Sequence, residues 1–422
     1  MAGNQEELVI LGSTGSIGRS TLEVIRHNGG RFRVSGLACS ANVELMAEQI
    51  VEFRPQVVSV GVGRADQLKD LLGKEGEKTV ILEGDEGNLE VAAGTKARKL
   101  IAAIVGAAGV APIMAAITAN KTIALANKEA LVLTGEIMME AARSRQVTIL
   151  PIDSEHNAVF QVLQGSQRQH IAHITLTASG GPFRTKPIER FAEITLKDAL
   201  NHPNWRMGPK ITIDSATMMN KALEVIEARW LFDLDPDRIR VLVHPQSIVH
   251  SMVTFIDGAT IAQMGVPDMK TPIAYALAYP DRVPSGSAFL NLEKQKQLTF
   301  EPPDRKKFPA IQLAYDALKM GGGVAAALNG ANEALVALFL KERISFAEIV
   351  VRLQEVLSTI SKRREDRGWM REHAHLYRIE TVQDALRADR WGRNFVASSG
   401  RCPVEKQDGC AVKAGRPALA AR

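Results

Sequence analysis

The sequence predicts an α/β protein with three parts: an N-terminal domain built on a parallel sheet (residues 1–153), a central α+β domain (154–280) and a small helical C-terminal domain (310–391). Three observations predict this arrangement. Short β-branched runs alternate with amphipathic helical runs up to about residue 150, the alternation stops in the central part, and only helical patterns follow residue 310. Strand–helix alternation indicates a parallel sheet covered by helices on both faces.

Seven runs in the first domain have the composition of buried strands. They are Glu7–Leu11, Phe32–Ala38, Val57–Gly61, Thr79–Leu82, Leu100–Val105, Thr122–Ala126 and Val147–Ile152. Helical patterns lie between them, for example at Ser16–His27, Val43–Phe53 and Lys128–Arg145.

The central domain mixes helices with strands. We expect a helix at Glu155–Gly165, β-type runs at Ile171–Thr177 and Ile211–Ile213, and a helix at Met218–Phe232 whose buried face carries Leu223, Ile226 and Trp230. Two further strands, Ile248–Phe255 and Ala259–Met264, flank Asp257-Gly258, which is a strong hairpin signal.

The remainder of the chain is predicted to be a linker, a helical domain and a tail. Residues 281–309 contain several prolines and little periodicity, which indicates a linker. Helical patterns resume at Ala310–Lys319, Val324–Lys341 and Phe346–Ser361. Beyond Trp391 the composition shifts to Gly, Ala, Arg and Pro without an apolar face, so we expect residues 392–422 to be disordered.

Composition excludes several classes of function. A chain of 422 residues with 45% hydrophobic and 23% charged residues has the composition of a globular protein with more than one core. The net charge of +5 is modest, and no basic stripe interleaved with aromatic residues indicates a nucleic-acid partner. Three cysteines without disulfide or zinc spacing favour a reducing cytoplasm. We recognise no targeting segment and no apolar run of membrane-spanning length, so no membrane partner is expected.

The first strand leads through a glycine-rich turn, with Gly12, Gly15 and Gly18, into the first helix. Glycines allow the tight turn and the close approach of a pyrophosphate, whose charge meets the helix N-terminal amides. This context favours a Rossmann-like dinucleotide-binding domain, although the same turn could serve helix–strand packing alone. The spacing G-x-x-G-x-x-G does not identify the cofactor.

The end of the second strand bears on the choice of cofactor. An NAD site usually carries Asp or Glu there to bind the ribose hydroxyls. This chain has neither, and Ser40 and Asn42 could donate to a 2′-phosphate, which favours NADP. Gly106, Gly109 and the run Asn127-Lys128-Glu129 follow later strands and should face the nicotinamide, with a packing role for the two glycines nearly as probable.

Asp153 and Glu155 follow the last strand of the first domain. In an extended segment, residues i and i+2 point to the same side, so we expect both carboxylates to converge. Converging carboxylates repel one another unless a cation lies between them, and hard oxygen ligands select Mg²⁺ or Mn²⁺. The alternative is a solvated strand end, which is the commoner meaning of Asp-x-Glu alone.

Three polar clusters lie in the central domain. Ser179 before two glycines can offer a hydroxyl and backbone N–H groups to a phosphate. Asn201–Gly208 is a loop rich in polar and aromatic residues, and Asn220, Lys221 and Glu224 can share one helix face. Each cluster alone is more often a turn, a surface loop or a solvated helix face.

Taken together, the motifs carry a resemblance. They occur in the order Gly-Ser-Thr-Gly-Ser-Ile-Gly, Ala-Asn-Lys-Glu, Pro-Ile-Asp-Ser-Glu-His-Asn, Ser-Gly-Gly-Pro-Phe, His-Pro-Asn-Trp-x-Met-Gly and Asp-Ser-Ala-Thr-Met-Met-Asn-Lys. Over roughly residues 7–360 the chain resembles the 1-deoxy-D-xylulose 5-phosphate reductoisomerase family. The resemblance implies a homodimeric, NADPH-dependent enzyme that uses Mg²⁺ or Mn²⁺ to rearrange this sugar phosphate, by retro-aldol cleavage or a ketol shift, and reduces the product to 2-C-methyl-D-erythritol 4-phosphate for isoprenoid precursors.

The resemblance also implies roles for individual residues. The metal ligands would be Asp153, Glu155 and Glu224, and the catalytic set adds Lys128 and His202. The substrate would be held by Lys128, Ser154, Glu155, Ser179, His202, Ser215, Asn220, Lys221 and Glu224. The cofactor would contact Thr14, Gly15, Ser16, Ile17, Ser40, Asn42, Asn127, Glu129 and Gly208. The loop with Trp205 and Met207 would be a flap over substrate and nicotinamide.

Two departures from the family pattern lie outside these positions. Ala41 stands where many members carry a basic residue, which bears on the NADP preference, and the chain after about Ser361 fits the family poorly. Two other functions stay open: another NADP-dependent dehydrogenase of sugar phosphates or semialdehydes, and a regulator that senses NADP without chemistry. The second would not need three carboxylates beside a Ser/Asn/Lys cluster.

Overall fold

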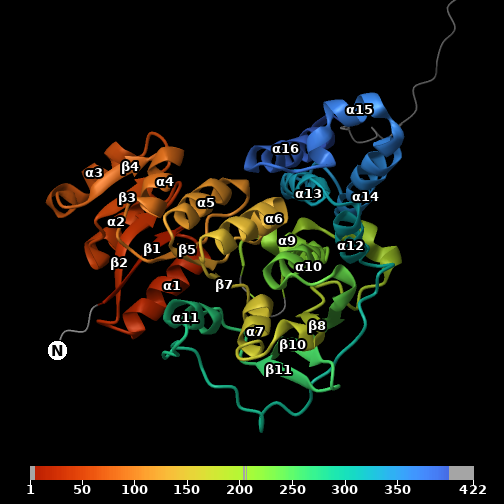
Figure 1. Ribbon diagram of the computed structural model, residues 1–422, viewed down its shortest axis with the longest axis horizontal. Helices are drawn as coiled ribbons and strands as arrows, with labels where there is room; N and C mark the ends of the chain where they lie inside the picture. Colours follow the sequence, from red (N-terminus) through yellow and green to blue (C-terminus); the bar gives the residue numbers. More distant parts are fainter. Residues whose placement is uncertain (1–4, 203–204, 206, 399–422) are drawn as a thin grey trace, which may run out of the picture.

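The computed structural model describes residues 5–202, 205 and 207–398. Its elements form three regions: an N-terminal sheet with its helices, a second sheet with helices α7 to α10, and a set of C-terminal helices that lies over α6 and α10 (Figure 1). In the described part of the chain, no helix combines the length and the apolar character that a membrane crossing requires.

The N-terminal sheet has seven parallel strands in the order β4-β3-β2-β1-β5-β6-β7. Their bounds are β1 Glu6–Leu11, β2 Phe32–Ala38, β3 Val57–Val60, β4 Val80–Glu83, β5 Lys99–Ala102, β6 Thr122–Leu125 and β7 Ile149–Pro151. The prediction of a parallel α/β domain is confirmed. The strand order reverses between β1 and β5, and such a switch point at the carboxyl ends of the strands is where these sheets bind ligands.

Helices cover both faces of this sheet. They are α1 Ser16–His27, α2 Val43–Phe53, α3 Ala65–Leu72, α4 Gly84–Ala93, α5 Val110–Thr118 and α6 Lys128–Ser144. Within β1, Leu8 and Ile10 pack with α1, α2 and α3, whereas Val9 and Leu11 pack with α4, α5 and α6. The alternation of side chains along a strand thus divides one strand between two cores.

The second sheet has the order β11-β10-β8-β9. It consists of β8 Ile171–Ala178, β9 Ile239–Val243, β10 Val249–Phe255 and β11 Thr260–Met264, and β10 runs antiparallel to β8 and β11. The predicted hairpin is confirmed, with Gly258 at φ +88° in its turn. The helices of this region are α7 Ser154–Val162, α8 Leu196–Ala199, α9 Pro209–Ala216 and α10 Met219–Phe232, and α11 Lys270–Ala278 follows the second sheet in the chain.

One predicted strand of the central part is wrong. Residues 211–213 lie inside α9 rather than in a sheet. Their composition, Ile-Thr-Ile, favours a strand, but Gly208 as N-cap and Pro209 in the first turn are a helix start, and Pro is preorganised for that position. Thr212 also donates to Gly208 O, 2.8 Å away, which strengthens the first turn.

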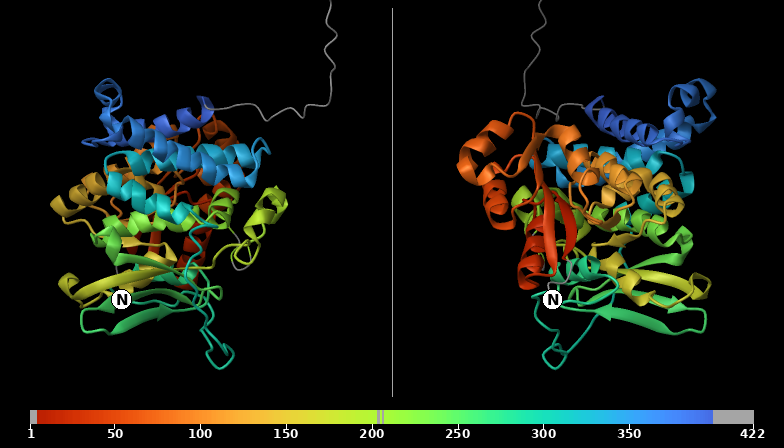
Figure 2. Two further views of the ribbon diagram at one scale, coloured as in Figure 1. Left: turned by 90° about the vertical axis from the view of Figure 1, so that its right-hand side faces the viewer. Right: turned by 60° about the vertical axis from the view of Figure 1, so that its left-hand side comes forward.

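The C-terminal helices are α12 Ala310–Met320, α13 Val324–Leu340, α14 Phe346–Lys362, α15 Arg367–Glu372 and α16 Val382–Ser398. Both views in Figure 2 show them as a layer on the side of the molecule away from the second sheet. Their buried side chains belong to the same core cluster as those of α6 and α10. The helical region therefore shares its core with the other two regions.

The prediction of disorder from residue 392 is wrong for residues 392–398, which are helical, and its remainder lies outside the described residues. The buried face of α16 uses small residues such as Ala385, Ala388 and Gly392. A Cβ at Gly392 would lie 2.0 Å from Ala327 O on α13, so the two helices touch through backbone. A helix face of small residues packs closely against its partner. It lacks the large apolar side chains whose spacing indicates an amphipathic helix in a sequence.

The segment between α11 and α12 is held by polar contacts. In it, Glu301 pairs with Val243 as an isolated bridge and forms an ion pair with Arg184, 2.7 Å between Nη1 and Oε1. Helix α11, although it follows the second sheet in sequence, packs against α1 and shares the core of the N-terminal sheet (Figure 1). The chain therefore crosses back to the first sheet before it reaches the C-terminal helices.

Candidate active site

The glycine-rich turn combines packing with an open helix N-terminus. A Cβ at Gly12, which has φ +82°, would lie 2.5 Å from Ala103 O, and one at Gly18 would lie 2.4 Å from Gly12 O. These two glycines are therefore required for the turn itself. Gly15 is the N-cap of α1, and no side chain caps that helix. Ser16 and Ile17, which follow it, line a cavity that also contains the carboxylates Asp153, Glu155 and Glu224.

Two of the expected cofactor residues cap helices at the carboxyl edge of the sheet. Asn42 Oδ1 accepts from Leu45 N at 3.0 Å and caps α2. Asn127 Oδ1 accepts from Ala130 N at 3.1 Å and caps α6, while its Nδ2 donates to Gly106 O at 2.9 Å. These bonds hold the loops after β2, β5 and β6 in place, so part of this motif has a structural role.

A cavity of about 410 Å³ lies between the N-terminal sheet and the second sheet. All of the residues expected to bind metal or substrate line it: Lys128, Asp153, Ser154, Glu155, Ser179, His202, Ser215, Asn220, Lys221 and Glu224. Of the expected cofactor residues, Ser16, Ile17 and Gly208 line it too. Thr14, Gly15, Ser40, Asn42, Asn127 and Glu129 lie outside that lining.

The geometry expected for Asp153 and Glu155 needs a correction. Asp153 is the N-cap of α7, and Glu155 lies in the first turn of that helix, so the two do not share one side of an extended segment. They reach the same cluster by another route. Asp153 Oδ2 lies 2.7 Å from Lys128 Nζ, and Glu155 Oε1 lies 2.7 Å from Lys221 Nζ.

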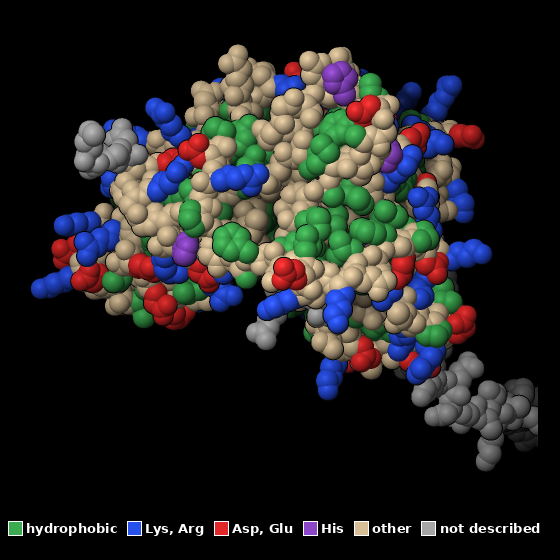
Figure 3. All heavy atoms as spheres, turned by 90° about the horizontal axis from the view of Figure 1, so that it is seen from below, with side chains coloured by type: hydrophobic (Ala, Val, Ile, Leu, Met, Phe, Trp, Pro, Cys, Tyr) green, Lys and Arg blue, Asp and Glu red, His purple; other side chains and the backbone are tan. Residues whose placement is uncertain are grey.

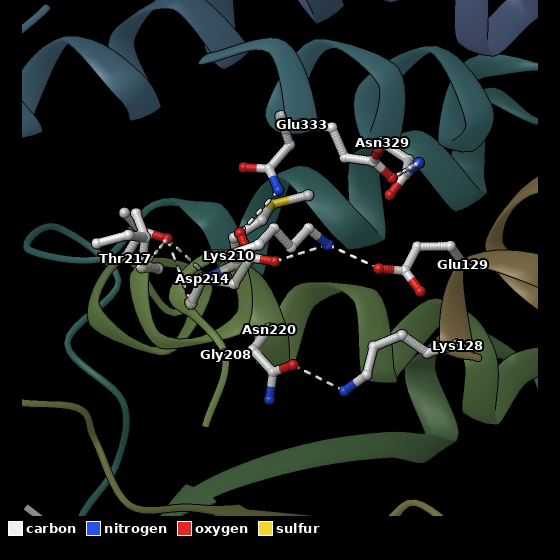
Figure 4. A network of polar contacts seen from close by, with 12 residues as sticks. Lys128, Glu129, Gly208, Lys210, Asp214, Thr217, Asn220, Asn329 and Glu333 are labelled. Atoms are coloured by element: carbon white, nitrogen blue, oxygen red, sulfur yellow. Dashed lines mark hydrogen bonds and ion pairs between the residues drawn. The ribbon is translucent and has the colours of Figure 1, made fainter. Parts of the chain in front are cut away.

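Glu224 joins the two halves of the cluster. Its side chain is fully buried, and Oε1 lies 3.4 Å from Lys128 Nζ and accepts from Asn220 Nδ2 at 2.6 Å. Its other oxygen, Oε2, contacts the Lys221 ammonium. Lys128 also donates to Asn220 Oδ1 at 2.7 Å, a contact visible in Figure 4. Two ammonium groups thus interleave with three carboxylates that come from α7 and α10.

The cluster holds more negative than positive charge, and the pKa of Glu224 reflects this. Burial, together with the neighbouring Glu155 carboxylate, raises the pKa of Glu224 to about 8. Burial also acts to raise the pKa of Asp153, but the Lys128 ammonium outweighs it and holds that pKa well below its usual range. A divalent cation would neutralise the carboxylate that the two lysines leave uncompensated.

Two of the three expected carboxylates, together with His156, lie close enough to share one cation, whereas Glu155 is not part of this group. Oxygens of Asp153 and Glu224 and a ring nitrogen of His156 lie within 4.8 Å of one another. Oxygen donors of this kind fit Mg²⁺ or Mn²⁺, and one nitrogen donor does not exclude either. The His156 Nε2 atom is 2.9 Å from the backbone oxygen of Glu224, so that ring braces the ligand helix.

A second polar group lies at the other side of the cavity. Trp205 N donates to His202 Nδ1 at 3.0 Å, which places the proton of the neutral ring on Nε2. Burial lowers the pKa of His202 and favours that neutral form. Nε2 then donates to Ser179 Oγ, 3.1 Å away, and Gly181 N donates to the same oxygen at 3.2 Å. The Ser179 hydroxyl proton is left to donate into the cavity.

Close backbone contact brings Ser215 to the same place. Gly180 and Gly181 both have positive φ, +85° and +67°. A Cβ at Gly181 would lie 2.6 Å from Ser215 O, so the turn after β8 rests directly on the end of α9. Ser179 and Ser215 both line the cavity here, and hydroxyl donors of this kind suit an anionic oxygen group.

Several lining residues were not singled out from the sequence. His250 on β10 and Ser247 before it line the cavity, as do Asp268 and Met269 before α11. Glu227 lies behind the cluster, 3.6 Å from His156 Nδ1, and burial raises its pKa to about 7. His250 was missed because it lies in the run Ile248–Phe255, which was interpreted only as a strand. The flap expected around Trp205 and Met207 involves residues 203, 204 and 206, which lie outside the described residues.

Fold and site together define a class of protein: an α/β protein of the dinucleotide-binding type with a cluster of carboxylates and serine hydroxyls in one cavity. Three family models match the chain. They are 1-deoxy-D-xylulose 5-phosphate reductoisomerase at residues 8–135, its C-terminal domain at 149–232, and the DXP reductoisomerase C-terminal domain at 264–395.

Relatives and solved structures agree with these models. The reductoisomerase of Geotalea uraniireducens is 49% identical over 92% of this chain and 97% of that protein, and that of Chlorobium limicola is 51% identical over 92% and 97%. A crystal structure of DOX-P reductoisomerase in complex with NADPH, fosmidomycin and magnesium is 42% identical, with a TM-score of 0.87 over 93% of this chain and 98% of that chain. The enzyme from Zymomonas mobilis in complex with NADPH gives 38% and 0.84, over 94% and 99%. The chain belongs to the 1-deoxy-D-xylulose 5-phosphate reductoisomerase family.

Proposed function

We propose that the chain converts 1-deoxy-D-xylulose 5-phosphate to 2-C-methyl-D-erythritol 4-phosphate, with NADPH as reductant and Mg²⁺ or Mn²⁺ as metal. One observation carries this proposal. Carboxylates from residues far apart in sequence, Asp153, Glu155 and Glu224, meet in a cavity whose wall includes Ser16 and Ile17 of the glycine-rich turn. Metal and cofactor sites are therefore adjacent.

The metal site is assigned to Asp153, Glu155 and Glu224. When bound there, a divalent cation supplies Lewis-acid stabilisation to the carbonyl and adjacent hydroxyl of the substrate. Lys128 is positioned to hold the same end of the substrate, since its ammonium lies 2.7 Å from Asp153 Oδ2. Ser154, whose hydroxyl donates to Glu155 Oε2 at 2.5 Å, orients that carboxylate. Lys221 contacts both Glu155 and Glu224 and so links the two carboxylates.

The phosphate end of the substrate is assigned to Ser179, Ser215, Asn220 and Lys221, with His202 beside them. The neutral His202 ring donates to Ser179 Oγ and so directs the Ser179 proton toward the ligand. Binding at this end is remote from the reacting carbons, so its free energy can be used to orient them. Helix α10 would contribute to both ends of the substrate site, with Glu224 at the metal and Asn220 and Lys221 at the phosphate.

The cofactor is assigned to the carboxyl edge of the N-terminal sheet. The contacts we propose are Thr14, Gly15, Ser16, Ile17, Ser40, Asn42, Asn127, Glu129 and Gly208. The pyrophosphate would meet the open N-terminus of α1, where backbone N–H groups and the helix dipole favour negative charge. Ser16 and Ile17 continue from there into the cavity, so the nicotinamide would enter beside the carboxylates.

The test is an assay of NADPH oxidation after addition of 1-deoxy-D-xylulose 5-phosphate. We expect turnover with Mg²⁺ or Mn²⁺, none after removal of metal with EDTA, and recovery when metal is restored. Aspartate semialdehyde and other sugar phosphates serve as control substrates. Turnover of one of these in place of 1-deoxy-D-xylulose 5-phosphate, or turnover that is unaffected by EDTA, would refute the proposal.

A homodimer is proposed as the assembled form. The face seen from below in Figure 3 gathers hydrophobic side chains. On the second sheet and the segment after α11, Ile256, Ile261 and Phe289 are large, exposed hydrophobic residues, and Phe289 is 99% exposed. Burial of such a surface against a second copy would remove apolar area from water. Light scattering after gel filtration measures the mass, and a monomer at micromolar concentration would contradict the assignment.

A further inference from the structure

Lys210 lies outside every assigned binding set, yet it joins two helices that line the site. It stands in the first turn of α9, two residues after Gly208, and its side chain reaches across to α6 (Figure 4). Its Nζ lies 2.7 Å from Glu129 Oε1 and 2.8 Å from Asp214 Oδ2. The Glu129 and Asp214 side chains are 7% and 1% exposed, so both carboxylates depend on this ammonium for compensation.

The position of Lys210 is not explained by helix stability. A cation in the first turn of a helix faces the positive end of the helix dipole, and α9 has no acidic residue in that turn to offset it. Its ion pairs outweigh this cost. Burial acts to lower the pKa of Lys210, but Asp214 and Glu129 outweigh it and raise that pKa above its ordinary value.

Each end of this contact is fixed to the rest of the fold. Asp214 Oδ1 accepts from Asn332 Nδ2 at 2.8 Å, and Asn332 is fully buried on α13. Glu129 follows the Asn127 cap of α6, which is bonded to Gly106 O. A line of polar contacts thus runs from the C-terminal helices through α9 to the carboxyl edge of the N-terminal sheet.

Residues next to Glu129 on α6 and next to Lys210 near α9 line the cavity. Lys128 precedes Glu129 on α6, and in Figure 4 the two side chains go to different partners: Lys128 to Asn220, Glu129 to Lys210. On the α9 side, Gly208, Ile211 and Ser215 line the cavity. A shift of α6 against α9 would therefore move Lys128 relative to the opposite wall.

We propose that Lys210 is a positioning residue: its ammonium, held between Glu129 and Asp214, fixes the first turn of α6, and with it Lys128, against the first turn of α9. Lys210 acts through these helices and does not touch the reacting groups. The effect on the reaction rests on the proposed function, because Lys128 is placed there in the substrate site.

Kinetics of Lys210→Met give the first test. We expect kcat to fall at least about tenfold, because small displacements of a catalytic group are costly, while KM for the substrate changes less than about threefold. Lys210→Arg should keep most of the activity, since a guanidinium can pair with both carboxylates. Lys99→Met is the matched control: it removes another buried ammonium, 2.8 Å from Glu6 Oε1 at the opposite edge of the sheet, and should leave kcat unchanged.

A double-mutant cycle distinguishes positioning from general destabilisation. Lys210→Met leaves the buried Glu129 and Asp214 carboxylates without their cation, whereas Lys210→Met with Glu129→Gln removes the charge at Glu129 and leaves Asp214 only its bond from Asn332. We expect kcat of the double variant, measured at saturating NADPH because Glu129 is also a proposed cofactor contact, to be no lower than that of Lys210→Met alone. If the two losses multiply, or if Lys210→Met keeps kcat within about twofold of the unaltered chain, the proposal is overturned.

Hydrogen exchange provides a readout without substrate, cofactor or metal. Peptides that span residues 127–131 and 208–214 should exchange faster in Lys210→Met, and those around the second sheet should not. Unchanged exchange in both peptides would overturn the proposal. If Lys210→Met does not fold, the double variant is compared with Glu129→Gln alone. An unaltered chain without activity would count against the proposed function, whereas the exchange result would still test the contact itself.

Discussion

The Lys221 ammonium lies 2.7 Å from Glu155 Oε1 and also contacts Glu224, which is three residues along on the same helix. A single cation therefore links carboxylates that are brought by α7 and α10. Lys128 does the same for Asp153 and Glu224 from α6. The charged cluster at the proposed metal site thus combines carboxylates from α7 and α10 with ammonium groups from α6 and α10.

Glu224→Gln should abolish most turnover while NADPH binding stays intact. Gln keeps the shape of the side chain but removes the charge that a divalent cation requires, and we expect kcat to fall at least about 100-fold. NADPH binding is measured by fluorescence titration and turnover at saturating magnesium. Glu136→Gln is the control, because Glu136 lies on α6, as Lys128 does, but is exposed. Unchanged activity at limiting metal would remove Glu224 from the ligand set.

Magnesium affinity should rise with pH. Burial and Glu155 raise the pKa of Glu224 to about 8, so below that pH the metal must displace a proton from this carboxyl group. Affinity should therefore increase from about pH 6.5 to about pH 8 and level off above it. Calorimetry in two buffers of different ionisation enthalpy measures the released proton. A constant affinity over this range with no proton release would contradict the assigned pKa direction.

Ser179→Ala should act on substrate binding. The hydroxyl that His202 and Gly181 orient would no longer donate to the phosphate, so KM for the sugar phosphate should rise about tenfold with little change in NADPH affinity. Ser166→Ala, at an exposed serine outside the cavity, is the control. An effect confined to NADPH affinity would contradict the assignment of Ser179 to the phosphate end.

Gly135→Ala should destabilise the junction of α6 and α10. A Cβ at Gly135 would lie 2.2 Å from the Trp230 ring, and overpacking of this kind costs about 1 to 3 kcal/mol. The midpoint of thermal unfolding should fall accordingly. Gly29→Ala is the matched control, because its Cβ would meet nothing nearer than 3.8 Å. Equal midpoints for the two variants would show that Trp230 can move aside at no cost.

Local sequence signals predicted most elements of the fold. The β-branched runs became the strands of the parallel sheet, and Asp257-Gly258 became the hairpin turn. The prediction was wrong at residues 211–213, where two local patterns indicate different structures. The composition favours a strand, but the helix start at Pro209 determines the structure. They also failed at α16, because its buried face is made of Ala and Gly, whose packing depends on the partner helix.

The candidate site divides in the same way. Residue types and motif order, including the carboxylates Asp153, Glu155 and Glu224, could be identified along the chain, and their role as metal ligands stays a prediction. The way in which these residues come together could not be predicted. Glu155 lies in the first turn of a helix rather than in an extended segment, and it joins the cluster by its ion pair with Lys221. His250, Glu227 and Lys210 carry no local pattern that separates them from ordinary strand or helix residues.

The sequence by itself determined the order of strands and helices, the glycine-rich turn and the chemical groups of the site, since each depends on residues close together in the chain. Only the tertiary structure decided which charges pair, how deeply Glu224 is buried, and that α13 supports α9 through Asn332 and Asp214. These properties depend on distances between segments far apart in sequence, and burial and electrostatic interaction are set by such distances.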